Sequence, residues 1–248
     1  ITTMRPYADK QTELLQSLSA TLDGDIGSDY TADREVKKVL LVAISSNRGL
    51  AGAFNSNIVK SSLSLINGTY KEKQVDFFTL GKKANDILNK EQTIIENNTE
   101  IFDELTYDNN AQIAQKLMNL FTDGTYDKII LIYNKFKNAA TQVIMNEQFL
   151  PIVSNQEPDE KVEVSDYIFE PSKEKIVEEL IPKSLKMQLF KALRDSSASE
   201  HGARMTAMHK ATDNATELRD ALTLQYNKAR QAAITNEILE IVGGAEAL

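Results

Sequence analysis

The sequence is poor in the residues that most enzymes use for covalent and metal chemistry. Its 248 residues include no cysteine and no tryptophan, and the only histidines are His201 and His209. The absence of cysteine excludes thiol nucleophiles, disulfides and cysteine-type zinc sites. The two histidines lie eight residues apart, whereas helical zinc pairs prefer a spacing of about four. An enzyme with this sequence would depend on carboxylates, lysines and hydroxyl groups, and we expect neither a metal nor a cofactor.

Long apolar runs and a surplus of basic residues are also missing. The longest apolar run, Val39 to Ile44, is far shorter than the roughly 18 residues that a membrane-spanning helix needs. The formal net charge is −8, and nucleic-acid-binding proteins usually carry a basic face. We therefore expect a globular chain with no nucleic-acid partner, although it can still dock on a membrane complex.

Proline and glycine are scarce in the last quarter of the chain. All five prolines lie at or before Pro182, and between it and the Gly243-Gly244 pair Gly202 is the only glycine. This pattern predicts a single helix that begins at Pro182 and ends near Val242. At 1.5 Å per residue, such a helix would be roughly 90 Å long, which is wider than a domain of this size. We expect it to extend beyond any single domain.

The middle of the chain alternates between strand-like and helix-like segments. Because only a short polar connection precedes the last predicted strand, that strand should pair antiparallel with its predecessor. The alternation predicts an α/β fold with a mostly parallel sheet and one antiparallel edge. The predicted strands are Val36–Ser46, Gln74–Leu80, Thr93–Asn97, Tyr126–Phe136 and Ala140–Ile152, and the predicted helices are Asn57–Ile66, Lys82–Lys90 and Asn110–Phe121.

These patterns divide the chain into four parts. A helical segment comes first, a polar linker follows, an α/β domain forms the middle and a long helix closes the chain. The corresponding ranges are 1–22, 23–35, 36–171 and 172–248.

An apolar stripe with the spacing of a coiled-coil seam follows the predicted long helix. The N-terminal helix has about 20 residues and could cover at most about a third of the stripe. The remainder needs a preceding helical segment, an enclosing protein or both, although an ordinary helical hairpin stays a plain alternative. The stripe consists of Met208, Ala211, Ala215, Leu218, Leu222, Ala229 and Ala232.

A short glycine-containing segment lies where a dinucleotide-binding fold would place its phosphate loop. Gly49 and Gly52 follow the first predicted strand and precede a predicted helix. The segment lacks the three glycines of the dinucleotide fingerprint and the Lys-Ser/Thr of a P-loop. Close packing of small residues and phosphate binding both remain open, and packing is favoured.

Two C-terminal segments resemble the gamma subunit of F-type ATP synthases. One runs from Ser199 to Ala215 (SEHGARMTAMHKATDNA), and the other from Tyr226 to Ile238 (YNKARQAAITNEI). Arg5-Pro6-Tyr7-Ala8 is similar to the end of that family's N-terminal helix, and Asn47-Arg48-Gly49-Leu50 is similar to the loop after its first strand. The resemblance covers the whole chain, closely at the C-terminus and loosely in the middle.

The resemblance implies a non-catalytic rotor subunit. In this family the terminal helices form an antiparallel coiled coil inside a hexamer of alternating alpha and beta subunits. A Rossmann-like domain forms a foot on the membrane rotor ring beside the epsilon subunit. Rotation driven by an ion gradient changes the conformations of the catalytic beta subunits and hence their nucleotide affinities. We expect no direct small-molecule substrate and a peripheral location on the cytoplasmic face of the bacterial membrane.

The same resemblance assigns roles to individual residues. Charged and polar residues on an enclosed helix need counter-charges on the partner, and the family's pattern places such contacts with beta at five positions. It places contacts with the ring at two positions of the foot. The implied beta contacts are Arg204, Arg230, Gln231, Thr235 and Glu237, and the implied ring contacts are Phe169 and Glu170. The family also carries roughly 50 residues before Arg5-Pro6-Tyr7, and we expect these to be missing from this chain.

Two other classes of function remain. The first is a nucleotide-binding α/β enzyme with a helical dimerisation arm, which depends on Gly49 and Gly52. The second is an unrelated coiled-coil adaptor. Nucleotide titration would distinguish the first from a rotor subunit, and reconstitution with alpha and beta subunits would distinguish the second.

Overall fold

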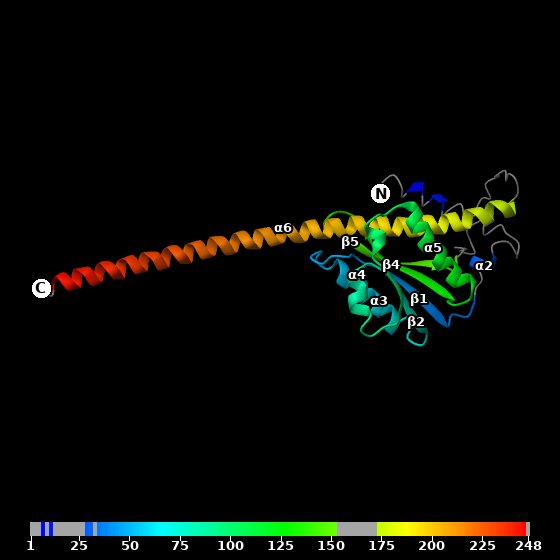
Figure 1. Ribbon diagram of the computed structural model, residues 1–248, viewed down its shortest axis with the longest axis horizontal. Coiled ribbons are helices and arrows are strands. Elements are labelled where there is room, and N and C mark those ends of the chain that lie inside the picture. The colour runs from blue at the N-terminus through cyan, green and yellow to red at the C-terminus, as the bar shows by residue number, and fades with distance from the viewer. Residues whose placement is uncertain (1–5, 8–9, 12–27, 32–33, 153–172, 247–248) are drawn as a thin grey trace, which may run out of the picture. The chain divides into compact units, whose positions relative to one another are not determined.

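The computed structural model describes residues 6–7, 10–11, 28–31, 34–152 and 173–246 (Figure 1). The chain divides into two compact units, Ile1–Arg204 and Met205–Leu248. A search of the described helices for a segment apolar enough to cross a membrane finds none.

From Ser28 onward, strands and helices follow one another, and residues 6–7 and 10–11 are also helical. The order confirms the predicted alternation, and a short helix also lies within the range predicted to be a linker. The elements are α2 (Ser28–Thr31), β1 (Lys38–Ile44), α3 (Phe54–Asn67), β2 (Gln74–Leu80), α4 (Lys82–Leu88), β3 (Ile94–Asn98), the 3-10 helix η1 (Glu100–Phe102), α5 (Tyr107–Thr122), β4 (Lys128–Phe136), β5 (Gln142–Leu150) and α6 (Lys173–Glu246).

The strands form one sheet in the order β3-β2-β1-β4-β5. β1 pairs in parallel with both β2 and β4, and β2 pairs in parallel with β3. β5 pairs antiparallel with β4. This topology confirms the predicted mostly parallel sheet with one antiparallel edge.

The central strand β1 contributes apolar side chains to both faces of the sheet. Leu40, Val42 and Ile44 belong to the core that includes residues of α5 and α6, whereas Val39 and Leu41 belong to the core that includes residues of α3 and α4. Successive side chains of a strand point to opposite faces, so an uninterrupted apolar run is suited to a strand covered on both sides. In Figure 1 the helix pair α3 and α4 lies across the sheet from α5.

The part of α6 inside the first unit packs on this sheet through a regular stripe. Ile181, Leu185, Leu189 and Leu193 recur every four residues and are at most 3 % exposed. This spacing places them on one face of the helix. Here α6 completes the core of the α/β domain.

Helix α6 runs past the ends expected from Pro182 and from the Gly243-Gly244 pair, and it lies within the 172–248 range predicted for the long-helix part of the chain. Pro182 lies inside α6, and the Gly243-Gly244 pair continues it to Glu246. An internal proline removes one backbone hydrogen bond, but Ile181 and Leu185 are buried on either side of it and hold the helix on the core. Glycine weakens a helix by only about 1 kcal/mol per residue, which is too little to end a long one.

Asp127 ties the start of β4 to the start of β1. One of its carboxylate oxygens accepts hydrogen bonds from the backbone N–H groups of Lys37 and Lys38, each at 2.8 Å. Burial alone would raise the pKa of Asp127, but these two donors and the charges of Arg34 and Lys37 outweigh burial and hold this pKa below its usual value. The charged carboxylate therefore favours the folded state.

We expect Asp127→Asn to show this linkage as a pH-dependent loss of stability. Because the folded pKa is lowered, the contribution is present above the unfolded value of about 3.9 and is lost as pH falls through the folded value. The free energy of unfolding should be lower in the variant at pH 7 and equal to that of the parent at the lowest pH. Urea titrations from pH 7 downward would check this, and a difference independent of pH would contradict it.

Candidate functional site

The strand order places the expected ligand site of this fold between β1 and β4. From β1 the chain continues to β2 and β3 on one side, whereas β4 lies on the other side. In open α/β sheets, ligands bind beyond the carboxyl ends of the strands where the order reverses in this way. The loops that follow Ile44 and Phe136 therefore decide whether the fold has a nucleotide crevice here.

Helix α6 packs against this edge of the sheet. Ser199 donates a hydrogen bond from Oγ to the backbone oxygen of Asn134 in β4, at 2.9 Å. A Cβ atom on Gly202 would lie 3.1 Å from both the Cα and the oxygen of Ala139, in the turn between β4 and β5. Ala203 shares a small buried cluster with Ala51 and Phe54. Side chains of α6 thus lie where a nucleotide would bind in a dinucleotide-binding relative of this fold.

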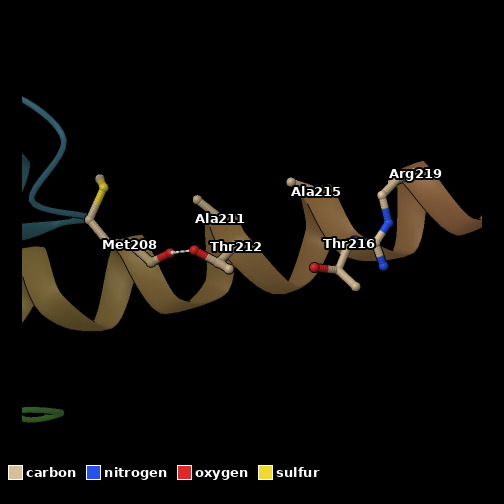
Figure 2. Close-up of a pocket in the computed structure, with 6 residues that line it drawn as sticks. All are labelled: Met208, Ala211, Thr212, Ala215, Thr216 and Arg219. Carbon is tan, nitrogen blue, oxygen red and sulfur yellow. Dashed lines mark hydrogen bonds between the residues drawn. The ribbon is translucent and has the colours of Figure 1, made fainter.

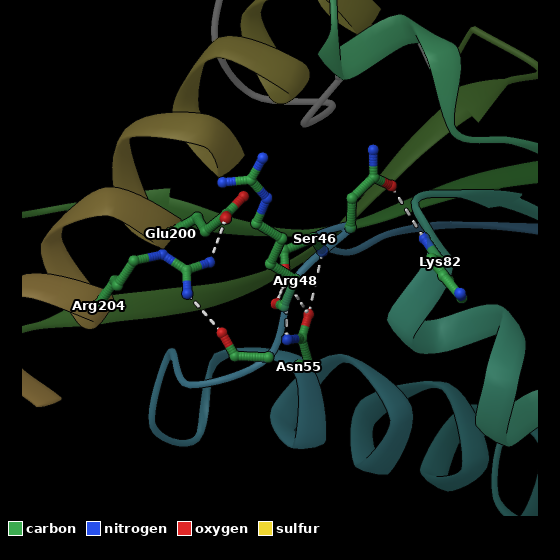
Figure 3. A network of polar contacts seen from close by, with 8 residues as sticks. Ser46, Arg48, Asn55, Lys82, Glu200 and Arg204 are labelled. Carbon is green, nitrogen blue, oxygen red and sulfur yellow. Dashed lines mark hydrogen bonds and ion pairs between the residues drawn. The ribbon is translucent and has the colours of Figure 1, made fainter.

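Arg204 completes the contact between α6 and the loop after β1 (Figure 3). Its Nη2 pairs with Oε1 of Glu200, one turn earlier, at 2.6 Å. Its Nη1 donates a hydrogen bond to the backbone oxygen of Gly49. The Arg204 side chain is 25 % exposed and that of Glu200 is 17 % exposed. The sequence predicted that a partner protein supplies the counter-charge of Arg204. In the structure, Glu200 of the same chain supplies a counter-charge.

Polar groups at the end of β1 cap helix α4. The N–H groups of Lys82, Lys83 and Ala84 donate to Oδ1 of Asn47, the backbone oxygen of Ser46 and Oγ of Ser45, at 3.0 to 3.1 Å. A phosphate-binding helix start needs such N–H groups directed at the ligand. At α4 they are occupied by the chain.

The segment after β1 is also bonded to the body of the α/β domain. Asn55 accepts a hydrogen bond from the backbone N–H of Ser46 at 3.0 Å (Figure 3), and Asn47 donates to the oxygen of Thr99 at 2.9 Å. Close packing and phosphate binding were the two predicted roles of this loop, and the buried side chain of Ala51 supports close packing. The glycines are not the reason, because a Cβ on Gly49 would come no nearer than 3.9 Å to another group and one on Gly52 would meet nothing within 4 Å.

Tertiary contacts require glycine at Gly81 and Gly202, and this requirement was not identified from the sequence at either position. Gly81 has φ +102°, and a Cβ there would lie 2.3 Å from the backbone oxygen of Ser45. Gly202 entered only as the sole glycine of a long helix, although it permits the close approach of α6 to Ala139. The signal that the sequence offered for this close approach was the isolated position of Gly202 within a strongly helical segment.

The described residues contain little apparatus for acid–base or metal chemistry. Across the described part of the chain, no group of three or more His, Cys, Asp or Glu residues could hold a metal ion. Tyr126 is buried, and burial, followed by its 2.9 Å hydrogen bond to Asp76, raises its pKa. This pair lies at the opposite end of β4 from the carboxyl edge, and we interpret it as a core contact.

Four of the remaining predicted contact residues lie in the second unit. Arg230, Gln231, Thr235 and Glu237 are exposed on α6, and Thr235 donates from Oγ1 to the backbone oxygen of Gln231 at 2.9 Å. Of the five predicted contacts with beta, Arg204 lies in the first unit and is paired with Glu200, whereas the other four lie in the second unit and are exposed. Phe169 and Glu170 lie outside the described residues, as does most of the predicted helix 1–22.

The described residues of the second unit form a single helix whose large apolar side chains are uncovered. Every residue from Met208 to Ala245 is exposed, and Leu218 and Leu222 have exposed fractions of 61 % and 54 %. Figure 2 shows Met208, Ala211 and Ala215 along one side of the helix. They line a shallow hollow together with Thr212, Thr216 and Arg219. A soluble helix with such a stripe needs a partner to cover it.

Comparisons with known proteins cover the full chain. A family model described as ATP synthase matches residues 1–248. The ATP synthase gamma chain of Christiangramia forsetii is 68 % identical over 248 residues, which are 100 % of this chain and 86 % of that relative. That of Flavobacterium psychrophilum is 66 % identical with the same coverage.

Solved structures share the fold at lower identity. A chain of the Euglena gracilis mitochondrial ATP synthase, titled OSCP/F1/c-ring in rotational state 3, superposes with a TM-score of 0.65 and 22 % identity over 99 % of this chain and 91 % of that one. A chain of the Tetrahymena thermophila enzyme, titled central stalk/c-ring, gives 0.55 and 24 % over 85 % and 98 %. The two matches confirm the predicted fold class. The family model and the sequence relatives establish that this chain belongs to the ATP synthase gamma-chain family.

Proposed function

We propose that this chain is the central-stalk rotor subunit of a bacterial ATP synthase and couples ion-driven rotation of a membrane ring to conformational change at the catalytic subunits. The observation that carries the proposal is the uncovered helix of the second unit, with its exposed apolar stripe and exposed polar residues. The proposal also uses the membership of this chain in the gamma-chain family. A shaft of this kind acts by contacting different conformations of its neighbours unequally, since only differential contact shifts their populations.

The partners follow from this role. An alpha and beta hexamer would enclose the helix of the second unit, and the N-terminal helix would cover part of its apolar stripe as a coiled coil. The epsilon subunit and the membrane ring would contact the α/β domain, with Phe169 and Glu170 toward the ring. The chain would itself bind no nucleotide and catalyse no reaction, and it would lie peripherally on the cytoplasmic face of the bacterial membrane.

The coupling contacts with beta are proposed at Arg204, Arg230, Gln231, Thr235 and Glu237. Four of these side chains are exposed on the helix and available to a partner. Arg204 is bonded to Glu200 and Gly49, which uses two of the five N–H donors of a guanidinium. Its other donors could bond a carboxylate of beta in the assembled complex.

We expect Arg230→Ala to reduce coupling without disturbing the fold. The side chain is exposed, so the free energy of unfolding should change by less than about 0.5 kcal/mol. Loss of a charged contact in an enclosed interface should lower gradient-driven ATP synthesis by about tenfold in complexes reconstituted with alpha and beta subunits. The matched control is Lys228→Ala, which removes an exposed cation two residues away on a different face of the same helix.

Equal synthesis in the Arg230 variant and the parent would contradict this coupling contact. Micromolar binding of ATP, GTP or NAD to the isolated chain would instead favour the nucleotide-binding enzyme. The contacts of α6 at the carboxyl edge of β1 and β4 argue against that alternative, because Ser199, Gly202 and Ala203 occupy the place of the ligand.

A further inference from the structure

The loop after β1 exposes a leucine in an unfavourable backbone conformation. Leu50 has φ +62° and is 78 % exposed. Residues with a branched side chain rarely adopt the left-handed region, and they remain there only when neighbouring contacts hold them. Exposure of this side chain gains nothing from the hydrophobic effect. The contacts that hold the loop from 47 to 53 must therefore offset an unfavourable conformation.

The body of the α/β domain holds the beginning of this loop. Asn47 bonds to Thr99 and to the N–H of Lys82, and Oγ of Ser46 donates to the oxygen of Arg48 at 2.6 Å. These bonds involve the loop only as far as Arg48. The next described polar contact along the loop is the one from Arg204 to the oxygen of Gly49, the residue immediately before Leu50. On the other side of Leu50, the backbone oxygen of Ala51 accepts a hydrogen bond from the N–H of Phe54, the first residue of α3, at 3.2 Å. The turn at Leu50 is thus held between α3 and α6, and Arg204 supplies the polar contact from α6.

Arg204 is well placed to hold a carbonyl group firmly. The Glu200 carboxylate, one helical turn away, orients the guanidinium through a 2.6 Å ion pair (Figure 3). Both side chains are at least three-quarters buried, where charged hydrogen bonds are stronger than in open solvent. Ala203, the residue before Arg204, shares a buried cluster with Ala51, the residue after Leu50.

We propose that Glu200 and Arg204 form a latch that holds the 47–53 loop on α6 in the conformation that exposes Leu50. Arg204 is the positioning residue, and Glu200 orients it. The mechanical consequence depends on the proposed rotor function: when α6 turns under load, the latch keeps this loop moving with the helix. The latch adds an intrachain role to the partner contact proposed for Arg204.

The experiment uses the fact that these 248 residues contain no cysteine. Leu50→Cys introduces a unique thiol in this sequence, and a nitroxide attached there reports the mobility of the loop by electron paramagnetic resonance. Adding Arg204→Ala should increase the ratio of mobile to immobile spin-label signal by about tenfold, because loss of a charged hydrogen bond shifts a local opening equilibrium by about that factor. Arg204→Lys, which keeps the charge but offers one donor nitrogen in place of the planar fork, should give an intermediate ratio.

Lys116→Ala is the matched control, because it removes an exposed 2.8 Å ion pair with Glu96 elsewhere in the same unit. It should leave the spectrum unchanged. Circular dichroism of each variant reports whether α6 remains folded, and hydrogen exchange of the 47–53 amides without a label gives a second measure of loop opening. An unchanged spectrum and unchanged exchange in a folded Arg204→Ala variant would overturn the latch. These measurements need no partner subunit, so they succeed or fail independently of the rotor function.

Discussion

Gly81→Ala should be among the most destabilising single-methyl additions available in this chain. A Cβ atom at Gly81 would lie 2.3 Å from the backbone oxygen of Ser45 and 2.8 Å from its carbonyl carbon. Neither atom can move away as a flexible side chain could, because Ser45 is bonded through its N–H to Leu80 at 2.8 Å. The residue also has φ +102°, which side-chain-bearing residues rarely adopt. We expect a loss on the order of 3 kcal/mol or more in the free energy of unfolding.

Two other glycines of the chain provide matched controls for this experiment. Gly52→Ala tests the backbone conformation alone, since Gly52 has φ +56° and open space around it, and about 1 kcal/mol is expected. Gly49→Ala has neither a positive φ nor a close neighbour and should stay within about 0.5 kcal/mol. Urea unfolding followed by near-ultraviolet circular dichroism of the buried Tyr126 and Tyr133 would measure all three. Equal losses at the three positions would contradict the steric argument.

The double variant Leu218→Asp/Leu222→Asp should have the largest effect on function. Both leucines are more than half exposed in the chain as described, so two carboxylates should change the stability of the isolated chain by about 1 kcal/mol at most. If a coiled-coil partner and an enclosing hexamer cover the stripe, each new charge must be buried without a counter-charge, which costs several kcal/mol. Gradient-driven ATP synthesis of the reconstituted complex should therefore fall by about tenfold or more.

The control for this variant carries the same two charges with the same spacing on another face. Thr223→Asp/Asn227→Asp adds two carboxylates four residues apart, turned by roughly 100° or more from Leu218 and Leu222. Its effect on synthesis should be smaller. Equal impairment by the two double variants would show that added charge, and not the apolar stripe, is responsible. Full synthesis by the Leu218 and Leu222 variant would contradict an enclosed stripe.

Much of the fold was predictable because its signals are local. The β-branched and apolar run around Val39 to Ile44 indicated a strand buried on both faces, and the short connection before Ala140 indicated the antiparallel edge. The ends of α6 were not predictable from Pro182 and Gly243 alone. Locally, an internal proline costs about 3 kcal/mol and a glycine about 1 kcal/mol. The packing of residues such as Leu185 and Leu189 on the sheet, which offsets the cost of the proline, is a tertiary effect.

The candidate site divides in the same way. The stripe of the second unit and its exposed polar residues follow from helical periodicity, so spacing alone located Leu218, Leu222 and Arg230 on a long helix. The role of Arg204 could not be read from spacing, because its acceptor at Gly49 lies 155 residues away in the chain. A contact across that separation has no local signature in one sequence.

The sequence by itself determined the class of the chain: an α/β domain joined to a long helix, without thiol chemistry and with a seam that needs a partner. The tertiary structure alone decided what occupies the carboxyl edge of the sheet. There Ser199, Gly202 and Arg204 of α6 pack against the ends of β1 and β4, where a phosphate loop remained conceivable. The physical reason is that periodicity and composition reflect the local preferences of a segment. Whether α6 or a ligand lies at the carboxyl edge of β1 and β4 depends on contacts between segments that are far apart in the sequence.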